Sequence, residues 1–262
     1  MPSNLNLEEM IQSGMHFGHF THEWNPRMSR YIYGKRNGRH ILDLVQTYSL
    51  IREALNFLEK SARQGKTFLF VGTKKQAAPL IAKTALACNS YYVNQRWLGG
   101  MLTNWRTIQK SLQKLQDYRS AEESGEWDAL KKQEVSRKRR EKERLEKYLG
   151  GLENMSKRPG VVIIVGQPEE IHAVRECRQL GIPTVTILDS NCDPTLADWC
   201  VPANDDSVSA LRLLLQSFEG AVLDGQKQYR ESQLTRREEQ EKQKAKKSTR
   251  QGIRAGKKVI NR

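Results

Sequence analysis

The sequence predicts an α/β protein built on a doubly wound, flavodoxin-like sheet of five parallel strands. Short apolar runs, rich in β-branched and aromatic residues, recur at 67–72, 91–93, 161–166, 184–189 and 199–204. Stretches with helical spacing of apolar residues separate most of these runs, and another such stretch, 44–62, precedes them. Continuous apolar strands that alternate with helices are typical of a parallel sheet covered on both faces. Right-handed crossovers then favour the strand order 2-1-3-4-5.

The segment before residues 44–62 is predicted to combine a short helix, a loop and a β-hairpin. Asn6 is placed to cap a short first helix. Residues 16–28 are rich in rings and show no clear period, which favours an ordered loop held by aromatic packing. Residues 31–42 read as strand, turn and strand, because Asn37-Gly38 suits the positive φ angles of a tight hairpin.

The crossover at 103–151 is too long for one helix. A break at Ser124-Gly125 divides it, and its second part mixes both charge signs on nearly every face. We expect a protruding two-helix (coiled-coil) hairpin inserted into an α/β domain that comprises 1–102 and 152–226.

Positive charge is concentrated at the end of the chain. The net charge is +14 and the isoelectric point is near 9.7. Residues 227–262 hold thirteen Lys and Arg against four Glu, a net +9. This balance favours a polyanionic partner, nucleic acid first, because each neutralised phosphate releases counterions. The same residues include almost no apolar side chains, so we expect this tail to be disordered alone and to order on RNA.

Other features exclude several classes of protein. The four cysteines, Cys88, Cys177, Cys192 and Cys200, lack zinc-finger spacing and are expected to be reduced core residues. No apolar run is long enough to cross a membrane. Glu8 and Glu9 stand where a signal or transit peptide would lack acids, so no targeting segment is expected.

An enzymatic alternative depends on the turn after the first parallel strand. Amides near Thr73, together with Lys74 and Lys75, could hold a phosphate at a helix N-terminus, and a solvated helix end is an equally good interpretation. This turn lacks the G-x-G-x-x-G pattern of dinucleotide sites. The alternative function is therefore an enzyme of flavodoxin-like fold acting on a phosphorylated small molecule.

Acidic and imidazole side chains offer weaker candidates. The aspartates near strand ends favour turns and helix caps over catalysis; they are Asp189, Asp193, Asp205 and Asp206. His16, His19 and His22 offer imidazole ligands for a metal, but packing or RNA-facing roles are favoured. No metal and no cofactor are expected.

Residues 94–105, "NQRWLGGMLTNW", combine two tryptophans, a Gly-Gly pair, amides and an arginine. RNA binding uses such groups: guanidinium forks on phosphates, amides on base edges and rings against bases. In the alternative interpretation both tryptophans belong to the core and the glycines form a turn.

Several motifs occur in one order at family-like spacing: "HFGH", "WNPRM", "FVGTKKQA", "VNQRWLGGMLTNW", "YLGG", "GIPTV", "LDSNCDP" and "PANDD". Together they closely resemble the S2 family of small-subunit ribosomal proteins, of bacterial and organellar type, over roughly residues 5–226. The resemblance implies an α/β domain with a protruding hairpin, docked on small-subunit rRNA between head and body. It implies a structural role in translation without catalysis, neighbouring ribosomal proteins as partners, and a contribution to recruiting ribosomal protein S1.

The N-terminal signature is carried by His16, Gly18, His19, Trp24, Asn25, Pro26 and Met28. The sequence departs from many relatives at Gly166, where an aspartate is common, and in its tail after Gln226. Details of "VGQPEE" and "PANDD" resemble plastid and cyanobacterial members, so a plastid stroma location is expected, with a bacterial cytoplasm as the alternative.

The combined interpretation gives a set of candidate RNA-binding residues. They are His16, His19, Trp24, Arg27, Arg30, Lys35, Arg36, Arg39, Lys74, Lys75, Asn94, Arg96, Trp97, Asn104, Trp105 and Arg106.

Overall fold

A five-stranded parallel sheet forms the centre of the molecule. The computed structural model describes residues 5–129 and 131–260. The strands are β4 (Phe68–Val71), β5 (Tyr91–Val93), β6 (Val161–Val165), β7 (Thr184–Leu188) and β8 (Trp199–Pro202). They are ordered β5-β4-β6-β7-β8, and each neighbouring pair is parallel. The predicted α/β class and the order 2-1-3-4-5 are confirmed.

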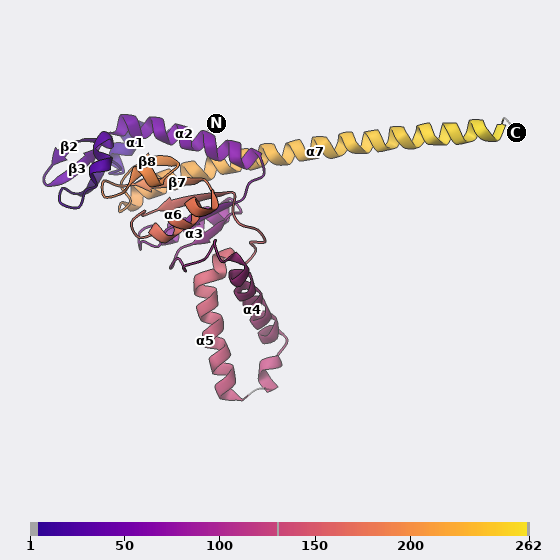
Figure 1. Cartoon of the computed structure of the whole chain (residues 1–262), viewed down its shortest axis with the longest axis horizontal. Coiled ribbons are helices and arrows are strands. Elements are labelled where there is room, and N and C mark those ends of the chain that lie inside the picture. Colours follow the sequence, from indigo (N-terminus) through magenta and orange to yellow (C-terminus); the bar gives the residue numbers. More distant parts are fainter. Residues whose placement is uncertain (1–4, 130, 261–262) are drawn as a thin grey trace.

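Helices cover both faces of this sheet (Figure 1). They include α1 (Leu7–Gln12), α2 (Leu44–Arg63), α3 (Ala78–Ala87), α6 (Ile171–Leu180) and α7 (Val208–Ile260). Phe68 and Phe70 of β4 join a core with residues of α2, α3 and α7. Leu69 and Val71 join a second core with α6 and the segment around Trp97. Because successive side chains of a strand face opposite ways, one apolar strand supplies both cores.

Local signals explain where α2 begins and ends. Asp43 caps it by accepting from the N–H groups of Val45, at 2.9 Å, and Gln46, at 3.3 Å. Gly65 follows the helix with a φ of +74°, a conformation that glycine adopts at little cost. The predicted helix at 44–62 is confirmed.

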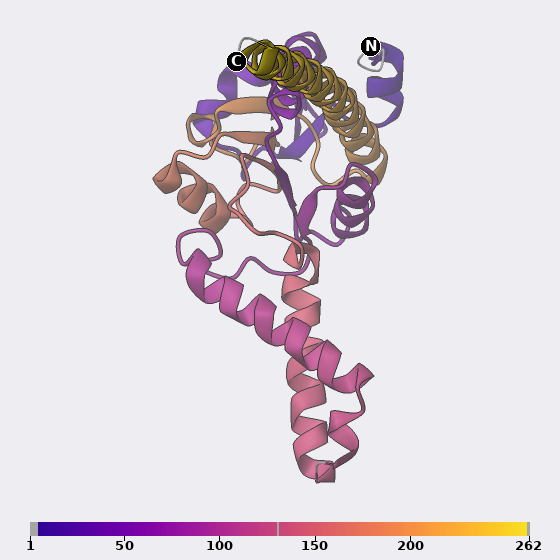
Figure 2. The same ribbon diagram turned by 90° about the vertical axis from the view of Figure 1, so that its right-hand side faces the viewer.

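Two helices lie between β5 and β6. These are α4 (Trp105–Glu123) and α5 (Lys132–Leu149), with the short 3₁₀ turns η2 (Glu126–Ala129) and η3 (Gly150–Leu152). They extend side by side away from the sheet (Figures 1 and 2). Charged and polar side chains connect them, since Tyr118 donates to Glu141 at 2.8 Å and Lys142 pairs with Glu122.

A small antiparallel sheet lies beside the main one. It contains β1 (Phe17–Phe20), β2 (Ile32–Arg36) and β3 (Arg39–Leu42) in the order β1-β3-β2. The β-hairpin predicted at residues 31–42 is confirmed, and its turn has positive φ angles at Asn37 and Gly38.

The predicted loop at 16–28 is wrong in part. It contains β1 and the start of the 3₁₀ helix η1 (Pro26–Tyr31). β1 gains its strand conformation by pairing with β3, so a partner some twenty residues away decides its structure. Asn25 caps η1 by accepting from the N–H of Arg27 at 3.0 Å.

The expectation of a disordered tail is also wrong, because α7 continues to Ile260 and leaves the body as one long helix (Figure 1). The packed first half of α7 supplies the costly helix nucleus. Residues 227–260 are rich in Lys, Arg, Glu and Gln, which have good helix propensity, and contain no proline to interrupt propagation.

Among the described residues, no helix combines the length and the hydropathy that crossing a membrane requires. Cys88, Cys177 and Cys192 are buried, Cys200 is half-buried, and all four are free thiols, as expected. A further 3₁₀ turn, η4 (Pro194–Leu196), precedes β8.

Candidate nucleic-acid interface

Three exposed cations gather at the tip of the β2–β3 hairpin. Arg36 lies opposite Arg39 in the antiparallel pair, and Lys35 lies opposite His40. Within the part of the chain that the structure describes, none of the three cations enters an ion pair. Like charges directly opposite one another destabilise a strand pair, so a bound anion would stabilise this tip.

Aromatic rings accompany these cations. The Arg39 guanidinium carbon lies 4.5 Å from the centroid of the Phe20 ring. The His16 ring lies against Phe17 at a centroid distance of 4.0 Å. Burial lowers the pKa of His16, so its imidazole is neutral at neutral pH.

The remaining candidates of the N-terminal signature differ in accessibility. Trp24 is partly exposed and packs against His40 at a centroid distance of 5.0 Å. Arg30 is exposed, and its guanidinium lies 5.5 Å from the Tyr31 ring. Arg27 pairs with Asp193, the residue that caps η4, as expected for a turn aspartate.

His19 attaches the N-terminal segment to the end of the main sheet. Its Nδ1 lies 3.0 Å from Asp189 Oδ2, and its backbone N–H donates to Ser190 Oγ at 2.9 Å. A Cβ on Gly18 would stand 2.9 Å from that same Oγ, so the "HFGH" glycine permits this close approach. The hydrogen bond to Asp189 outweighs burial and raises the pKa of His19 to about 9. His19 is therefore positively charged at neutral pH, and its ion pair with Asp189 holds the N-terminal segment against the main sheet.

Lys74 is enclosed by carboxylates. Its Nζ lies 2.6 Å from Asp205 Oδ1 and 3.0 Å from Asp206 Oδ1. Burial lowers the pKa of Lys74, but the carboxylates more than offset this effect, and the net shift is upward. Burial, aided by Asp189, raises the pKa of Asp205 to about 6. The N–H of Thr73 donates to Glu170 at 2.9 Å, so the amide considered for phosphate binding is occupied. Lys75 is exposed.

One nitrogen of His19 and one carboxylate oxygen each of Asp205 and Asp206 lie within 4.8 Å of one another. These potential metal-ligand atoms are close enough to share a cation. The Lys74 ammonium already bonds to both of these carboxylates and neutralises part of their charge. This group contains His19 but neither His16 nor His22, the other two histidines considered from the sequence. The Nε2 atom of His22 lies 3.6 Å from Glu23 Oε1 instead.

The central stretch folds around one buried carboxylate, Glu176 of α6. Oε1 of Glu176 accepts from Trp97 Nε1 at 3.0 Å and from the Gly100 N–H at 2.8 Å. Oε2 accepts from the N–H groups of Leu102 and Thr103, both at 2.9 Å, and from Thr103 Oγ1 at 3.1 Å. Burial raises the pKa of Glu176, but these donors outweigh it and the net shift is downward. The stretch is thus held as a rigid loop around a carboxylate anion.

Both tryptophans of this stretch belong to the core. Trp97 and Trp105 are each 7% exposed and pack with Met101 and Leu102. The interpretation of the two indoles as base-stacking platforms therefore finds no support, because their faces are covered. The core interpretation fits.

The polar residues around them divide into bonded and free groups. Asn94 donates to the Ala78 carbonyl at 3.3 Å, and Asn104 accepts from Thr107 Oγ1 at 2.9 Å. Arg96 and Arg106 are exposed and are available to a partner.

A sequence profile of the family described as ribosomal protein S2 matches residues 10–225. The chain belongs to the ribosomal protein S2 family. Members of this family are structural components of the ribosome, so this S2-family protein is not an enzyme.

Three relatives show which branch of the S2 family the chain resembles. It is 73% identical to the small ribosomal subunit protein uS2c of Chlorella vulgaris over 248 residues, 95% of this chain and 91% of the relative. It is 57% identical to uS2c of Oltmannsiellopsis viridis over 229 residues, 87% and 96% of the two chains. It is 52% identical to uS2 of Trichormus variabilis over 237 residues, 90% and 88% of the two chains.

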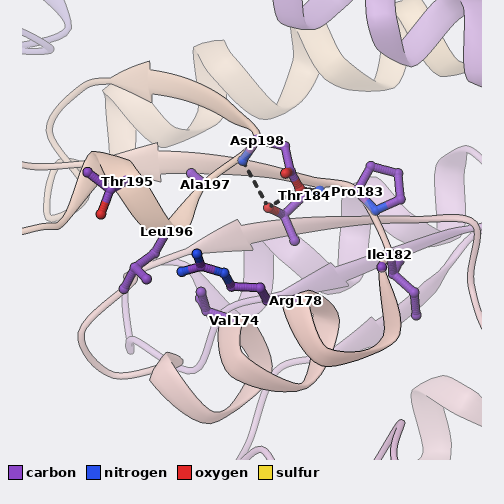
Figure 3. A pocket seen from close by; sticks show the side chains of 10 residues that line it. Val174, Arg178, Ile182, Pro183, Thr184, Thr195, Leu196, Ala197 and Asp198 are labelled. Atoms are coloured by element: carbon purple, nitrogen blue, oxygen red, sulfur yellow. Dashed lines mark hydrogen bonds between the residues drawn. The ribbon is translucent and has the colours of Figure 1, made fainter.

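The carboxyl end of the S2-family sheet, where enzymes of this class place their sites, is filled by the His19 and Lys74 clusters. A hollow of about 270 Å³ lies instead near the start of β7 and β8. There Asp198 accepts from the Thr184 N–H at 2.8 Å, and Arg178 extends along the opening (Figure 3). This hollow is a recess in the surface, and the hydrogen bonds between Thr184 and Asp198 at its edge hold β7 and β8 together.

Sequence reasoning missed Glu176 and Glu170, the two carboxylates that fix the loops after β5 and β4. One signal was available for Glu176. It lies among the apolar residues Ala173, Val174 and Cys177 on the buried face of α6, where an unpaired carboxylate would be costly.

Proposed function

We propose that this chain, a structural constituent of the small ribosomal subunit, binds small-subunit rRNA chiefly through the tip of the β2–β3 hairpin. The observation that carries the proposal is the cluster of Lys35, Arg36 and Arg39, which has no ion-pair partner among the described residues. Phosphate oxygens are the acceptors that guanidinium and ammonium groups at such a protrusion would bind. Arg30, Lys75, Arg96 and Arg106 are exposed and extend this candidate surface.

Docking between the head and the body of the subunit, support of translation and contact with neighbouring small-subunit proteins belong to the same proposal. The helices α4 and α5 are suited to a protein neighbour or to solvent, because ion pairs such as Lys114–Glu141 consume much of their charge. Ribosomal protein S1 is a proposed partner that co-purification can test. The division into 1–102 with 152–226, 103–151 and 227–262 is likewise a proposal.

The location follows from the relatives. Two of them carry the uS2c name and one is cyanobacterial. We therefore place the chain in the plastid ribosome, with a bacterial ribosome as the alternative.

Charge reversal at the hairpin tip tests the proposal. The variant Lys35→Glu/Arg36→Glu/Arg39→Glu should lose to the wild-type chain in a competition for incorporation into small subunits, because each reversed charge repels phosphate. Quantitative mass spectrometry of purified subunits gives the ratio of the two chains. Incorporation at wild-type levels would show that the tip does not bind rRNA.

A control variant carries the same change in net charge elsewhere. Lys60→Glu/Lys83→Glu/Lys110→Glu alters exposed lysines on α2, α3 and α4, outside the proposed surface. It should compete nearly as well as the wild type, which separates a local contact from a general loss of positive charge.

A further inference from the structure

A hollow of about 720 Å³ lies over the small antiparallel sheet. Its wall includes Phe17 of β1, Ile41 of β3, and Tyr33 and Gly34 of β2. Phe17 and Gly34 both lie opposite Ile41 in the strand register, so they flank it on one face of the sheet. The volume is in the range of pockets that enclose small organic ligands.

Gly34 contributes no side chain to the lining of this hollow. A Cβ built at this position would have no heavy atom within 4 Å. The backbone at Gly34 does not have a positive φ, so a side chain would fit there without strain. The absence of a side chain is thus not required by packing or by backbone conformation.

Two aromatic rings border the hollow and remain accessible. Tyr33 is 81% exposed and Phe17 is 43% exposed, which is high for large rings. Both β1 and β2 carry an irregularity in pairing with β3, and Tyr33 lies at the one in β2. Such irregularities redirect side chains, and here one coincides with a largely exposed ring that lines the hollow.

Cations occupy the rim of the hollow. Lys35, Arg36 and Arg39 line it together with the rings, and His16 adds a neutral imidazole beside Phe17. A ligand suited to this site would offer a flat aromatic group for the rings and phosphates for the cations. A double helix presents phosphates but no free base face, because its bases are stacked on one another.

We propose that this hollow binds an unpaired nucleotide of RNA, with the base against Phe17 and Tyr33 and the flanking phosphates at Lys35, Arg36 and Arg39. This inference rests on the proposed rRNA binding and specifies the kind of nucleotide bound. Stacking does not depend on salt, whereas phosphate contacts do, so the two contributions can be measured separately.

The test measures binding of the full chain to transcribed small-subunit rRNA by filter retention over a series of salt concentrations. Phe17→Leu and Gly34→Val should each weaken binding on the order of tenfold, because one removes a stacking ring and the other fills the hollow. The slope of log affinity against log salt should stay at the wild-type value. Lys35→Gln/Arg36→Gln should weaken binding and flatten the slope.

Tyr33→Phe is the matched control, because it retains the ring and removes only the hydroxyl; it should bind like the wild type, whereas Tyr33→Leu should not. Ultraviolet crosslinking followed by mass spectrometry should place nucleotide adducts on Phe17 or Tyr33.

Two outcomes separate the inference from the proposed function. If Phe17→Leu, Tyr33→Leu and Gly34→Val bind like the wild type while the charge variant is weaker, the tip contacts phosphates and the nucleotide site is wrong. If the charge variant also binds like the wild type with an unchanged slope, the proposed rRNA contact at this tip is wrong as well.

Discussion

Buried carboxylates organise the loops at the carboxyl end of the main sheet. Glu176 holds the loop after β5, Glu170 holds the turn after β4, and Asp189 holds the N-terminal segment through His19. Each bonds to donors more than seventy residues away in sequence. A buried charge is costly unless it is fully hydrogen-bonded, so each carboxylate fixes one loop conformation.

Replacing Glu176 should destabilise the protein. Glu176→Ala leaves five neutral donor groups without their acceptor, and each buried donor left unsatisfied costs about 1–3 kcal/mol. Thermal unfolding followed by circular dichroism measures the change. Gln179→Ala, at an exposed position of the same helix, should leave the melting temperature nearly unchanged. Equal melting temperatures for both variants would contradict the role assigned to Glu176.

The His19–Asp189 pair should make stability depend on pH. The pKa of His19 is about 9 in the folded chain and near 6.5 when the pair is broken. Its stabilisation is therefore fully present below about pH 6.5 and is lost as the pH rises through about 9. The melting temperature of the wild type minus that of His19→Gln should shrink over this interval. A difference that stays constant from about pH 6 to about pH 10 would contradict the raised pKa.

At the scale of elements, α2 and α7 come into close contact at a glycine, Gly225. A Cβ on Gly225 would stand 2.4 Å from the carbonyl oxygen of Glu59 and 2.6 Å from the Cβ of Ala62. The two backbones can cross there only because position 225 lacks a side chain. The helical pattern at 44–62 locates α2, but the sequence does not reveal that a glycine of α7 lies at the contact.

Two glycines of α7 provide a matched test of this contact. Gly225→Ala should destabilise the protein by about 1–3 kcal/mol, because the added methyl group overlaps α2. Gly220→Ala should be neutral or stabilising by up to about 1 kcal/mol, since its Cβ meets nothing within 4 Å and alanine favours the helix. Chemical denaturation measures both. A stabilising Gly225→Ala would show that the helices are farther apart than described.

At the scale of the whole molecule, the uneven distribution of charge is the main feature. Beyond Arg236 the sequence has ten Lys and Arg against three Glu. Residues 237–260 belong to the part of α7 that extends away from the body (Figure 1). A surplus of positive charge over a short stretch of sequence attracts polyanions. Interactions of α7 with α2, such as the hydrogen bond of Gln228 with Glu59 at 3.0 Å, lie before this point.

Truncation after Arg236 should therefore leave the fold intact and weaken RNA binding. For every phosphate that the tail binds, removal of the tail should reduce the slope of log affinity against log salt by close to one. The melting temperature should match that of the full chain, because the packing of α7 against α2 is preserved. If the slope is unchanged, the tail does not bind phosphates.

The sequence by itself determined the class, the strand order and the family. These depend on apolar periodicity and on residue motifs, which are local or linear properties of a chain. Only the tertiary structure decided that Trp97 and Trp105 are buried, that Lys74 faces carboxylates, and that Glu176 holds the central stretch. In each case the partner comes from a distant segment. Whether a cation is free to bind phosphate depends on which carboxylates packing brings beside it, and local pattern does not encode that proximity.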